Sequence, residues 1–517
     1  MIQLNINKTW FQNEEMTKKL VKEIYERKVL ESDDYKRIDT DFKFYEGKLP
    51  EIQISEKKKK DGFEPQVVNL AKPITDTATK TFIGVLPDLV SSGTKKEKDK
   101  INVLYQKLYK RAFNAKIFQT GKNSSICGSG LLCVYNKIGD KFPRFRELNP
   151  RMADVVYDCT LEQNRICAFN IIEFDNIDNN TKGYDVYIYT DEEIIVYEIT
   201  QDSTKKLQFN PLLVFVTQGQ NVHRIRHGYS TIPIFEFPNN AEFKGDSECV
   251  QGLIRLYNNL LNNRCINVHD IVNYILWLKN VRIGDEEEQQ AIIDMLENHG
   301  LLPTEGEDTE VKYLSNPLNQ DELQTLQKSI EDLIHQISRV PDLTSVDFTQ
   351  NASDPIIKIK TKPLLDLCNE KELVFTEPYF ELLECVLKWC EKNDKEDYEK
   401  YNADLDLCTL AYAHPLPSND LDIVTQISNL SNAGVLSPED ALQEISWIKN
   451  VHKYVENAKK WKASVDKEKS QNDNINSGVN AHNIEKQNEK PIETGQLDNK
   501  RNGAQMSANR ISDNNVE

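Results

Sequence analysis

The sequence has no long apolar run, and this absence sets the first limit on the class of protein. None of its apolar runs reaches the roughly 18 residues that a membrane-spanning helix needs. The first residues, MIQLNINKTWFQNEEMTKK, also lack the basic-then-apolar order of a secretory signal. We therefore expect a protein of the cytosol that has no membrane partner.

Positive charge is in deficit, because 64 lysines and arginines face 82 aspartates and glutamates, which leaves a net charge of −18. A protein that holds nucleic acid by its phosphates normally carries a surplus of basic residues. A chain of this charge repels DNA at long range. If it meets DNA, we expect it not to hold the DNA tightly.

Paired cysteines are missing too, since the ten cysteines include no C-x-x-C pair. In a reducing compartment, scattered cysteines of this kind are small buried hydrophobic side chains. Their spacing therefore predicts neither disulfides nor a zinc site.

The usual motifs of catalysis and cofactor binding are absent as well. QTGKNSS at residues 119–125 has the end of a phosphate-binding loop, but that loop needs a glycine at the position of Lys116. His223 and His227 have no cluster of carboxylates or thiolates near them in the sequence, which favours a surface pair over a metal site. We predict no catalytic residue, no metal site, no cofactor and no enzymatic activity.

What the chain does contain is a succession of helical and strand patterns. Residues 14–45, 69–84 and 101–130 have helical character. Residues 131–217 consist of short β-branched and aromatic runs separated by Asn, Asp and Gly, which predicts an antiparallel meander. Apolar residues then recur every three or four positions through residues 249–280, which predicts a helix of about thirty residues, roughly 45 Å long.

Further helices follow in the second half. Residues 319–340 place apolar side chains alternately three and four positions apart. Residues 356–393 are a second long helical segment, with a kink expected at Pro378, and residues 418–462 read as two or three short helices. From residue 464 onward almost no apolar residue occurs, which predicts disorder. Together these patterns predict an α+β fold.

A polar segment separates two of the helices. RVPDLTSVDFTQNASDPIIKIK, residues 339–360, contains no Gly and no His, and it has no Lys or Arg between Pro341 and Lys358. Residues 342–357 therefore offer no cation that could form an ion pair with an anionic ligand.

The order of these segments resembles the portal proteins of tailed bacteriophages, the SPP1-type, Siphoviridae-like portal family. The resemblance spans roughly residues 15–460 and is carried by six segments in the same order. They are FYEGKLP (44–50), NLAKPITDTATKTFIG (69–84), GYSTIPIFEFPNN (228–240), VQGLIRLYN (250–258), VPDLTSVDFTQNAS (340–353) and LPSNDLDIVTQISNLSNAGVLSPEDAL (416–442).

The resemblance implies an elongated α+β portal subunit with long stem helices, a β-containing wing, a small clip and a helical crown. The expected parts are the wing (1–248), a stem helix (249–274), the clip (275–318), a second stem helix (319–340), the tunnel loop (341–355), a long kinked helix with the wing return (356–415), the crown (416–463) and a disordered tail (464–517). Asp354-Pro355 stands where relatives are expected to have a small, Gly-containing sequence, which stiffens the far end of the loop.

The resemblance also implies a function and a location. Twelve subunits would form a homo-oligomeric ring at one vertex of the capsid, around a channel for the packaging and ejection of double-stranded DNA. The implied partners are the terminase large subunit, a head-completion or adaptor protein, the scaffold protein and the major capsid protein. The protein would reside in the virion at the portal vertex, and in the host cytoplasm before assembly.

Three sets of residues receive roles in this interpretation. The DNA-facing tunnel loop would use Asp342, Thr344, Ser345, Asp347, Thr349, Gln350, Asn351 and Ser353. The acidic clip that docks partners would use Asp285, Glu286, Glu287, Glu288, Glu305, Glu307, Asp308 and Glu310. The subunit contacts of the stem would be Leu323, Leu326, Ile330, Leu333, Ile337 and Val340.

Two other classes stay open on the sequence alone. The first is a nucleic-acid-processing enzyme of the same packaging system, which needs a cluster of carboxylates around a metal. Asp404 and Asp406 are a candidate pair, but no third ligand accompanies them. The second is a non-viral helical scaffold or adaptor. Assembly separates the classes, because a scaffold need not close into a ring and an enzyme should show metal-dependent turnover.

Overall fold

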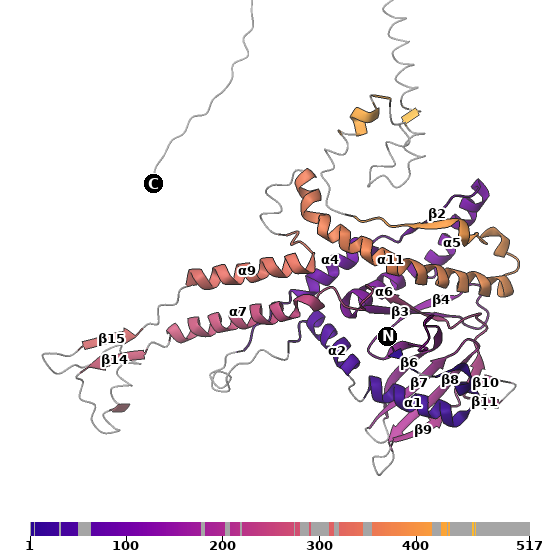
Figure 1. Cartoon of the computed structure of the whole chain (residues 1–517), viewed down its shortest axis with the longest axis horizontal. Helices are drawn as coiled ribbons and strands as arrows, with labels where there is room; N and C mark the ends of the chain where they lie inside the picture. The colour runs from indigo at the N-terminus through magenta and orange to yellow at the C-terminus, as the bar shows by residue number, and fades with distance from the viewer. Residues whose placement is uncertain are drawn as a thin grey trace, which may run out of the picture. The chain divides into compact units, whose positions relative to one another are not determined.

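The computed structural model divides into two compact units, Met1–Ser418 and Asn419–Glu517. It describes residues 2–4, 6–29, 33–49, 64–176, 181–201, 207–217, 220–272, 275–279, 289–290, 310–314, 320–344, 354–415, 425, 427–431, 433–434, 458–459 and 461. The helices and strands labelled in Figure 1 belong to the first unit. In the second unit, residues 427–431 are helical. Most of the predicted crown and all of the predicted tail lie outside the described residues.

The largest sheet has the strand order β1-β5-β6-β7-β8-β12, with β9 paired to β8. β5 to β9 pair antiparallel in chain order, as the predicted meander requires, whereas β1 is parallel to β5. The strands are β1 (Ile2–Gln3), β5 (Ala153–Tyr157), β6 (Arg165–Asn176), β7 (Thr181–Tyr189), β8 (Glu193–Gln201), β9 (Leu207–Pro211) and β12 (Arg224–Arg226).

One face of this sheet packs against the helix α1 (Glu14–Lys28). Alternate residues of a strand point to the same face, so Phe169 and Ile171 of β6 share a buried cluster with Leu20 and Ile24 of α1. The side chain of Asn13 caps α1 by accepting the backbone N–H groups of its first turn. The predicted helical stretch 14–45 is in fact two helices, because α2 (Asp33–Glu46) is separate.

A second, three-stranded sheet has the order β13-β3-β4. Its strands are β3 (Ser129–Tyr135), β4 (Arg144–Leu148) and β13 (Ile234–Pro238). The prediction that residues 131–217 form one meander is therefore wrong at its start. β3 is buried on both faces: Leu132 lies in the cluster below the helices, and Leu131 lies in a cluster shared with the large sheet.

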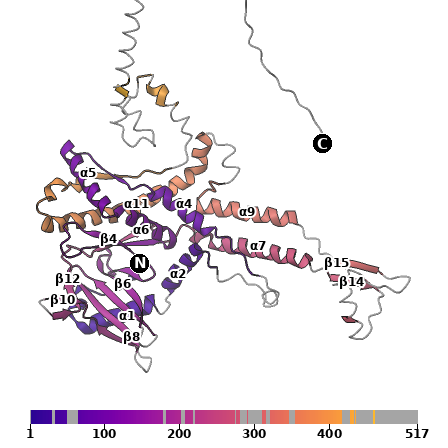
Figure 2. The same ribbon diagram turned by 180° about the vertical axis from the view of Figure 1, so that it is seen from behind.

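A layer of helices covers this smaller sheet (Figures 1 and 2). It consists of α4 (Ala71–Ile83), α5 (Lys95–Lys110), α6 (Phe113–Cys127) and α11 (Asp354–Asn393). α11 is 40 residues long and stays helical through Pro363 and Pro378. Because the layer packs α11 on β13 and α6 on β3, segments from both halves of the chain share one core.

Short elements complete this unit. Two small antiparallel sheets pair β2 (Asp88–Ser91) with β16 (Cys408–Ala411) and β10 (Phe215–Thr217) with β11 (Gln220–Val222). The 3₁₀ helices are η1 (Lys8–Gln12), η2 (Glu248–Val250), η3 (Tyr398–Lys400) and η4 (Leu405–Leu407).

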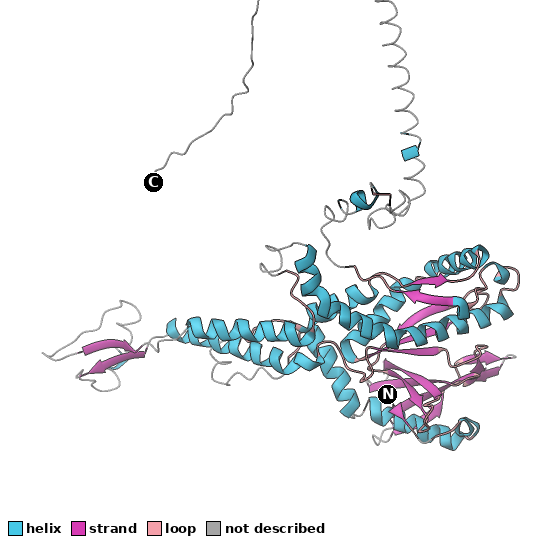
Figure 3. Ribbon diagram, turned by 45° about the horizontal axis from the view of Figure 1, so that its top comes forward, coloured by secondary structure: helices cyan, strands magenta, loops and turns pink. Residues whose placement is uncertain are grey.

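The helices α7 (Gln251–Val272) and α9 (Gln320–Ser338) lie side by side and lead to the hairpin of β14 (Ile275–Lys279) and β15 (Glu310–Leu314) (Figure 3). The predicted helix over 249–280 is thus too long. The short run ILWLK fits a helix or a strand equally well by its apolar pattern alone. Pairing with β15 decides in favour of the strand.

Candidate functional site

The apolar stripe of α9 divides into a buried row and an exposed row. Ile330 and Ile334 are 4% and 0% exposed and pack in the core that also contains residues of α7. Leu326, Leu333 and Ile337 remain 47%, 43% and 47% exposed. A group of exposed apolar side chains on one helix marks a surface for interaction. We call these three residues the apolar row.

Two further residues of the predicted stripe do not belong to the apolar row. Leu323 is half-buried. Val340 is 1% exposed, but it lies beyond the helix, which ends at Ser338. Arg339 has a positive φ of 61°, the left-handed conformation that ends many helices, and this turn directs Val340 into the core. Ile334 was not predicted, although it follows Ile330 at the expected spacing of four.

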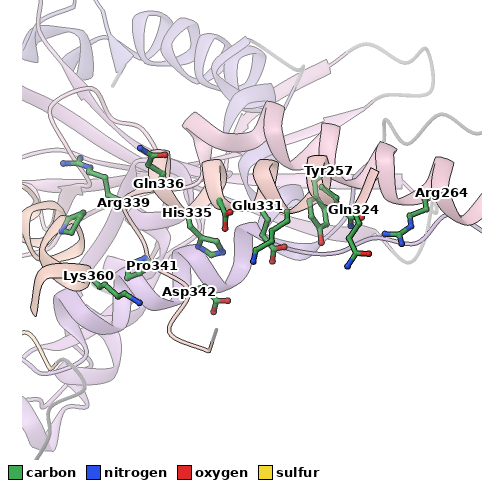
Figure 4. Close-up of a pocket in the computed structure, with 14 residues that line it drawn as sticks. Tyr257, Arg264, Gln324, Glu331, His335, Gln336, Arg339, Pro341, Asp342 and Lys360 are labelled. Carbon is green, nitrogen blue, oxygen red and sulfur yellow. The ribbon is translucent and has the colours of Figure 1, made fainter. Parts of the chain in front are cut away.

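A groove of about 840 Å³ lies along a different flank of α9 (Figure 4). It is lined by Tyr257 and Arg264 of α7, by Gln324, Gln327, Lys328, Glu331, Asp332, His335, Gln336 and Arg339, by Pro341 and Asp342, and by Lys360 and Pro363 of α11. Side chains two positions apart in a helix point about 200° apart around the helix axis. Leu333 of the apolar row and His335 of the groove therefore face opposite flanks.

The connection from α9 to α11 begins with a turn that its own side chains hold. Asp342 Oδ1 accepts the backbone N–H of Thr344 at 2.9 Å and its hydroxyl at 2.7 Å. Asp favours such turns because its carboxylate can bond the backbone two residues on. The other predicted tunnel-loop residues lie outside the described residues: Ser345, Asp347, Thr349, Gln350, Asn351 and Ser353.

The far end of the connection enters a helix directly. Asp354 and Pro355 are the first two residues of α11. Proline is tolerated in the first turn of a helix because its missing N–H would have no partner there. The dipeptide predicted to stiffen the loop therefore serves as the start of α11.

Two asparagines of α7 hold an extended segment that sequence reasoning missed. The side-chain amide of Asn258 accepts from Val68 N–H at 2.7 Å and donates to Val68 O at 3.1 Å. Asn262 does the same with Gln66, at 2.8 Å in both directions. Both asparagines are almost fully buried. The sequence YNNLLNNR could have indicated these contacts. Asparagine is a poor helix former, so several asparagines in one helix suggest that their amides bond another segment.

Charged groups also meet at the start of α7. Asp41 of α2 is buried, and its Oδ1 accepts from Gln251 Nε2 at 2.6 Å. Arg37 Nη1 lies 3.5 Å from Asp41 Oδ2 and 3.2 Å from Glu248 Oε2. Burial, and next the negative charge of Glu248, raise the pKa of Asp41 to about 7.

Little of the predicted acidic clip falls within the described residues. Glu310 is the first residue of β15 and pairs in register with Lys279 of β14. The remaining members lie outside the described part of the chain: Asp285, Glu286, Glu287, Glu288, Glu305, Glu307 and Asp308.

The motifs considered for catalysis have structural roles. Residues 119–125 lie within α6, where Lys122 Nζ is 3.2 Å from Asp76 Oδ1. Asp404 Oδ1 accepts the backbone N–H of Asp406 and begins η4. Across the residues that the structure describes, no three His, Cys, Asp or Glu side chains lie together as metal ligands.

The histidine pair is not the surface pair that the sequence suggested. His227 is half-buried: its Nε2 lies 2.9 Å from Thr190 O, and its Nδ1 accepts the Tyr229 backbone N–H at 3.1 Å. Burial lowers the pKa of both His223 and His227. The ring nitrogens of His227 are thus used to hold the turn after β12.

Comparison with known proteins completes the description. In the described part of the chain, no helix is both long and apolar enough for a membrane span. No curated protein matches the chain significantly. The family model of phage portal proteins, SPP1 Gp6-like, matches residues 30–471, which is most of the chain. This match spans the three-stranded sheet, the large sheet apart from β1, the helix pair α7–α9 and α11. The chain belongs to the SPP1 Gp6-like family of phage portal proteins.

Proposed function

We propose that this portal protein closes into a ring of twelve subunits in which the apolar row of α9 meets the next subunit. The observation that supports the contact is the 43–47% exposure of Leu326, Leu333 and Ile337 on a helix whose Ile330 and Ile334 are buried in the core. Complete burial of one such side chain stabilises a contact by roughly 1.5–3 kcal/mol, so completing the burial of three half-exposed ones gives a few kcal/mol per contact.

The two flanks of α9 favour a ring over a dimer. A dimer with twofold symmetry uses the same surface on both partners, whereas a ring uses two different surfaces of each subunit. α9 offers two such surfaces, the apolar row and the groove, which face different directions. In the proposed ring the row of one subunit lies beside the groove of the next.

The connection between α9 and α11 would line the channel and face double-stranded DNA. Its predicted contact residues are polar or acidic, so none forms a lasting ion pair with phosphate. Twelve copies of the chain carry a net charge of roughly −200, which opposes tight adsorption of DNA. The ring would thus guide DNA during packaging and ejection without turnover of its own.

The hairpin end of the α7–α9 pair would be the docking platform. Its acidic segment, with Glu286, Glu287 and Glu288, would meet the terminase large subunit during packaging and a head-completion or adaptor protein afterwards. The wing would contact the scaffold and the major capsid protein at the portal vertex. Before assembly the subunit would be in the host cytoplasm.

The test of the ring is the mass and shape of the purified assembly. We expect negative-stain images of rings with a central hole and a native mass of twelve subunits. Leu333→Glu should reduce the ring fraction at least about tenfold, since placing a carboxylate in an apolar contact costs more than 1.4 kcal/mol. Thr325→Glu is the control, because the exposed Thr325 precedes Leu326 and lies about 100° from it around α9. Equal ring fractions for both variants would rule out the α9 contact.

A further inference from the structure

Three consecutive charged residues near the middle of α11 each contact a different segment. Glu370, Lys371 and Glu372 follow one another in the helix, where successive side chains point about 100° apart. A helix on a protein surface normally points one of three such residues at its neighbours and the others at solvent. Here all three have side-chain partners from outside α11.

Glu370 binds the end of α9. Its two carboxylate oxygens accept from Arg339 Nη1 at 2.7 Å and from Nη2 at 2.8 Å, a two-point contact that fixes both groups. Arg339 is the residue with the positive φ at which the chain leaves α9 for the connection. The contact thus fixes Arg339, the residue at which the chain turns away from the axis of α9.

Lys371 binds the segment that leads into α7. Its Nζ lies 2.6 Å from Asp246 Oδ2, with both side chains 1% exposed, and it also donates to Ser125 Oγ of α6 at 2.9 Å. The other oxygen of Asp246 accepts from Asn239 Nδ2 at 2.8 Å. A buried ion pair with its remaining bonds made resists separation, because each ion alone would be costly to bury.

Glu372 binds the segment that leaves the sheets after β16. Its Oε1 lies 2.6 Å from His414 Nε2, and His414 Nδ1 lies 3.1 Å from Thr81 O of α4. Thr376, one turn further along α11, reaches Tyr412 OH at 3.2 Å. We call residues 408–415, which are β16 and the four residues after it, the exit segment. This segment is therefore attached to α11 at two successive turns.

We propose that Glu370, Lys371 and Glu372 are positioning residues that make α11 move as one body with the roots of α7 and α9 and with the exit segment. The connection between α9 and α11 is anchored at one end by Arg339 and continues at the other into α11. A shift imposed on the connection is then passed to the start of α7 and to residues 408–415. The role in DNA passage rests on the proposed function, whereas the mechanical coupling does not.

The experiment exchanges the charges of the most accessible contact. Arg339→Glu and Glu370→Arg are made singly and together, and backbone hydrogen exchange is followed in α9, in the first turn of α7 and in residues 408–415. We expect each single variant to speed exchange in all three segments by about fivefold or more, and the double variant to restore it. Glu370→Gln, which keeps the shape of the side chain, should act in the same direction with a smaller effect.

The control is an ion pair of the same helix that links nothing else. Lys388 and Glu384 are both exposed and lie four residues apart on α11, 3.0 Å from Nζ to Oε2. Their exchange, Lys388→Glu with Glu384→Lys, and either single change should leave the three segments unaltered. If Arg339→Glu changes only α9, or if the double variant is no closer to the wild type than the singles, the coupling is refuted.

Packaging separates this inference from the proposed function. Rings of the single variants should package DNA more slowly than the wild type, with recovery in the double variant. Coupled exchange with unaltered packaging would mean that the junction plays no part in DNA passage. Failure of the wild type to form rings would refute the proposed function, and the exchange measurements would still decide the coupling.

Discussion

Asp41 shows how a single buried carboxylate can link α2 to the start of α7. Its oxygens receive hydrogen bonds from Gln251 and Arg37, but Glu248 shares the same arginine. One cation therefore serves two carboxylates in a place where water has little access. Burial and the charge of Glu248 therefore favour the protonated form of Asp41, which raises its pKa to about 7.

A pH dependence of stability follows from Asp41. Its pKa is about 7 in the folded state against 3.8 for the free group, so between these values the folded protein holds a proton that the unfolded chain has lost. Stability should therefore fall as pH rises from about 4 to about 7, by up to roughly 4 kcal/mol, and then level off.

Thermal unfolding at pH 5 to 8 checks this. Asp41→Asn should make stability depend less on pH, so that the stability of this variant relative to the wild type increases as pH rises. Asp99→Asn, which removes the same charge from an exposed site on α5, should run parallel to the wild type. Parallel curves for Asp41→Asn and the wild type would contradict the assignment.

At the scale of elements, periodicity in the sequence predicts where a helix or strand forms. It does not predict features that depend on contacts with segments distant in sequence. The stripe over residues 319–340 predicts α9, but periodicity cannot say that Ile330 faces the core while Leu333 stays exposed. That division depends on the position of α7, which is fixed by contacts distant in sequence. The end of α9 at Ser338 likewise depends on the contact between Arg339 and Glu370.

Strand pairing shows the same limit. The β-branched and aromatic runs predict β5 to β9 as strands, and their short connections predict antiparallel neighbours. Nothing local in β3 indicates that it pairs with β13, about a hundred residues later in the chain, rather than with the meander. The apolar pattern of β14 predicts a helix for a related reason, since only the pairing with β15 distinguishes a strand from a helix there.

The connection between α9 and α11 allows a test at the level of one element. Thr349→Lys with Asn351→Lys would add roughly two dozen positive charges to a ring of twelve, each able to release a counterion on meeting phosphate. We expect rings of normal size in which DNA translocation stalls, more strongly at low salt. Single-molecule packaging rates measure this.

Thr349→Gln with Asn351→Gln is the matched control, because it lengthens the side chains without adding charge. It should translocate DNA at nearly the wild-type rate. Normal packaging by the lysine variant, with rings intact, would mean that this connection does not face DNA.

At the scale of the whole molecule, the charge of the chain and its assembly support each other. A net charge of −18 opposes tight adsorption of DNA on a single subunit, and a ring of such subunits multiplies that repulsion. Docking of the packaging motor calls for a surface other than the one that faces DNA. The acidic segment after β14 is the candidate, since β14, the strand that precedes it in the chain, lies at the end of the α7–α9 pair that points away from the two sheets (Figure 3).

Charge reversal of that segment tests whether it docks the motor. Glu286→Lys, Glu287→Lys and Glu288→Lys together should weaken binding of the terminase large subunit at least about tenfold, because electrostatic complementarity governs such encounters. The effect should shrink at high salt, where charges at a surface are screened. Ring formation should persist, since the apolar row of α9 is untouched.

Reversal of Asp99, Glu162 and Glu399, three exposed acids elsewhere in the first unit, gives the same change in net charge and should leave binding within about twofold of the wild type. Equal losses in both triple variants would show that the motor responds to net charge alone, and the hairpin end of the α7–α9 pair would then not be its docking site.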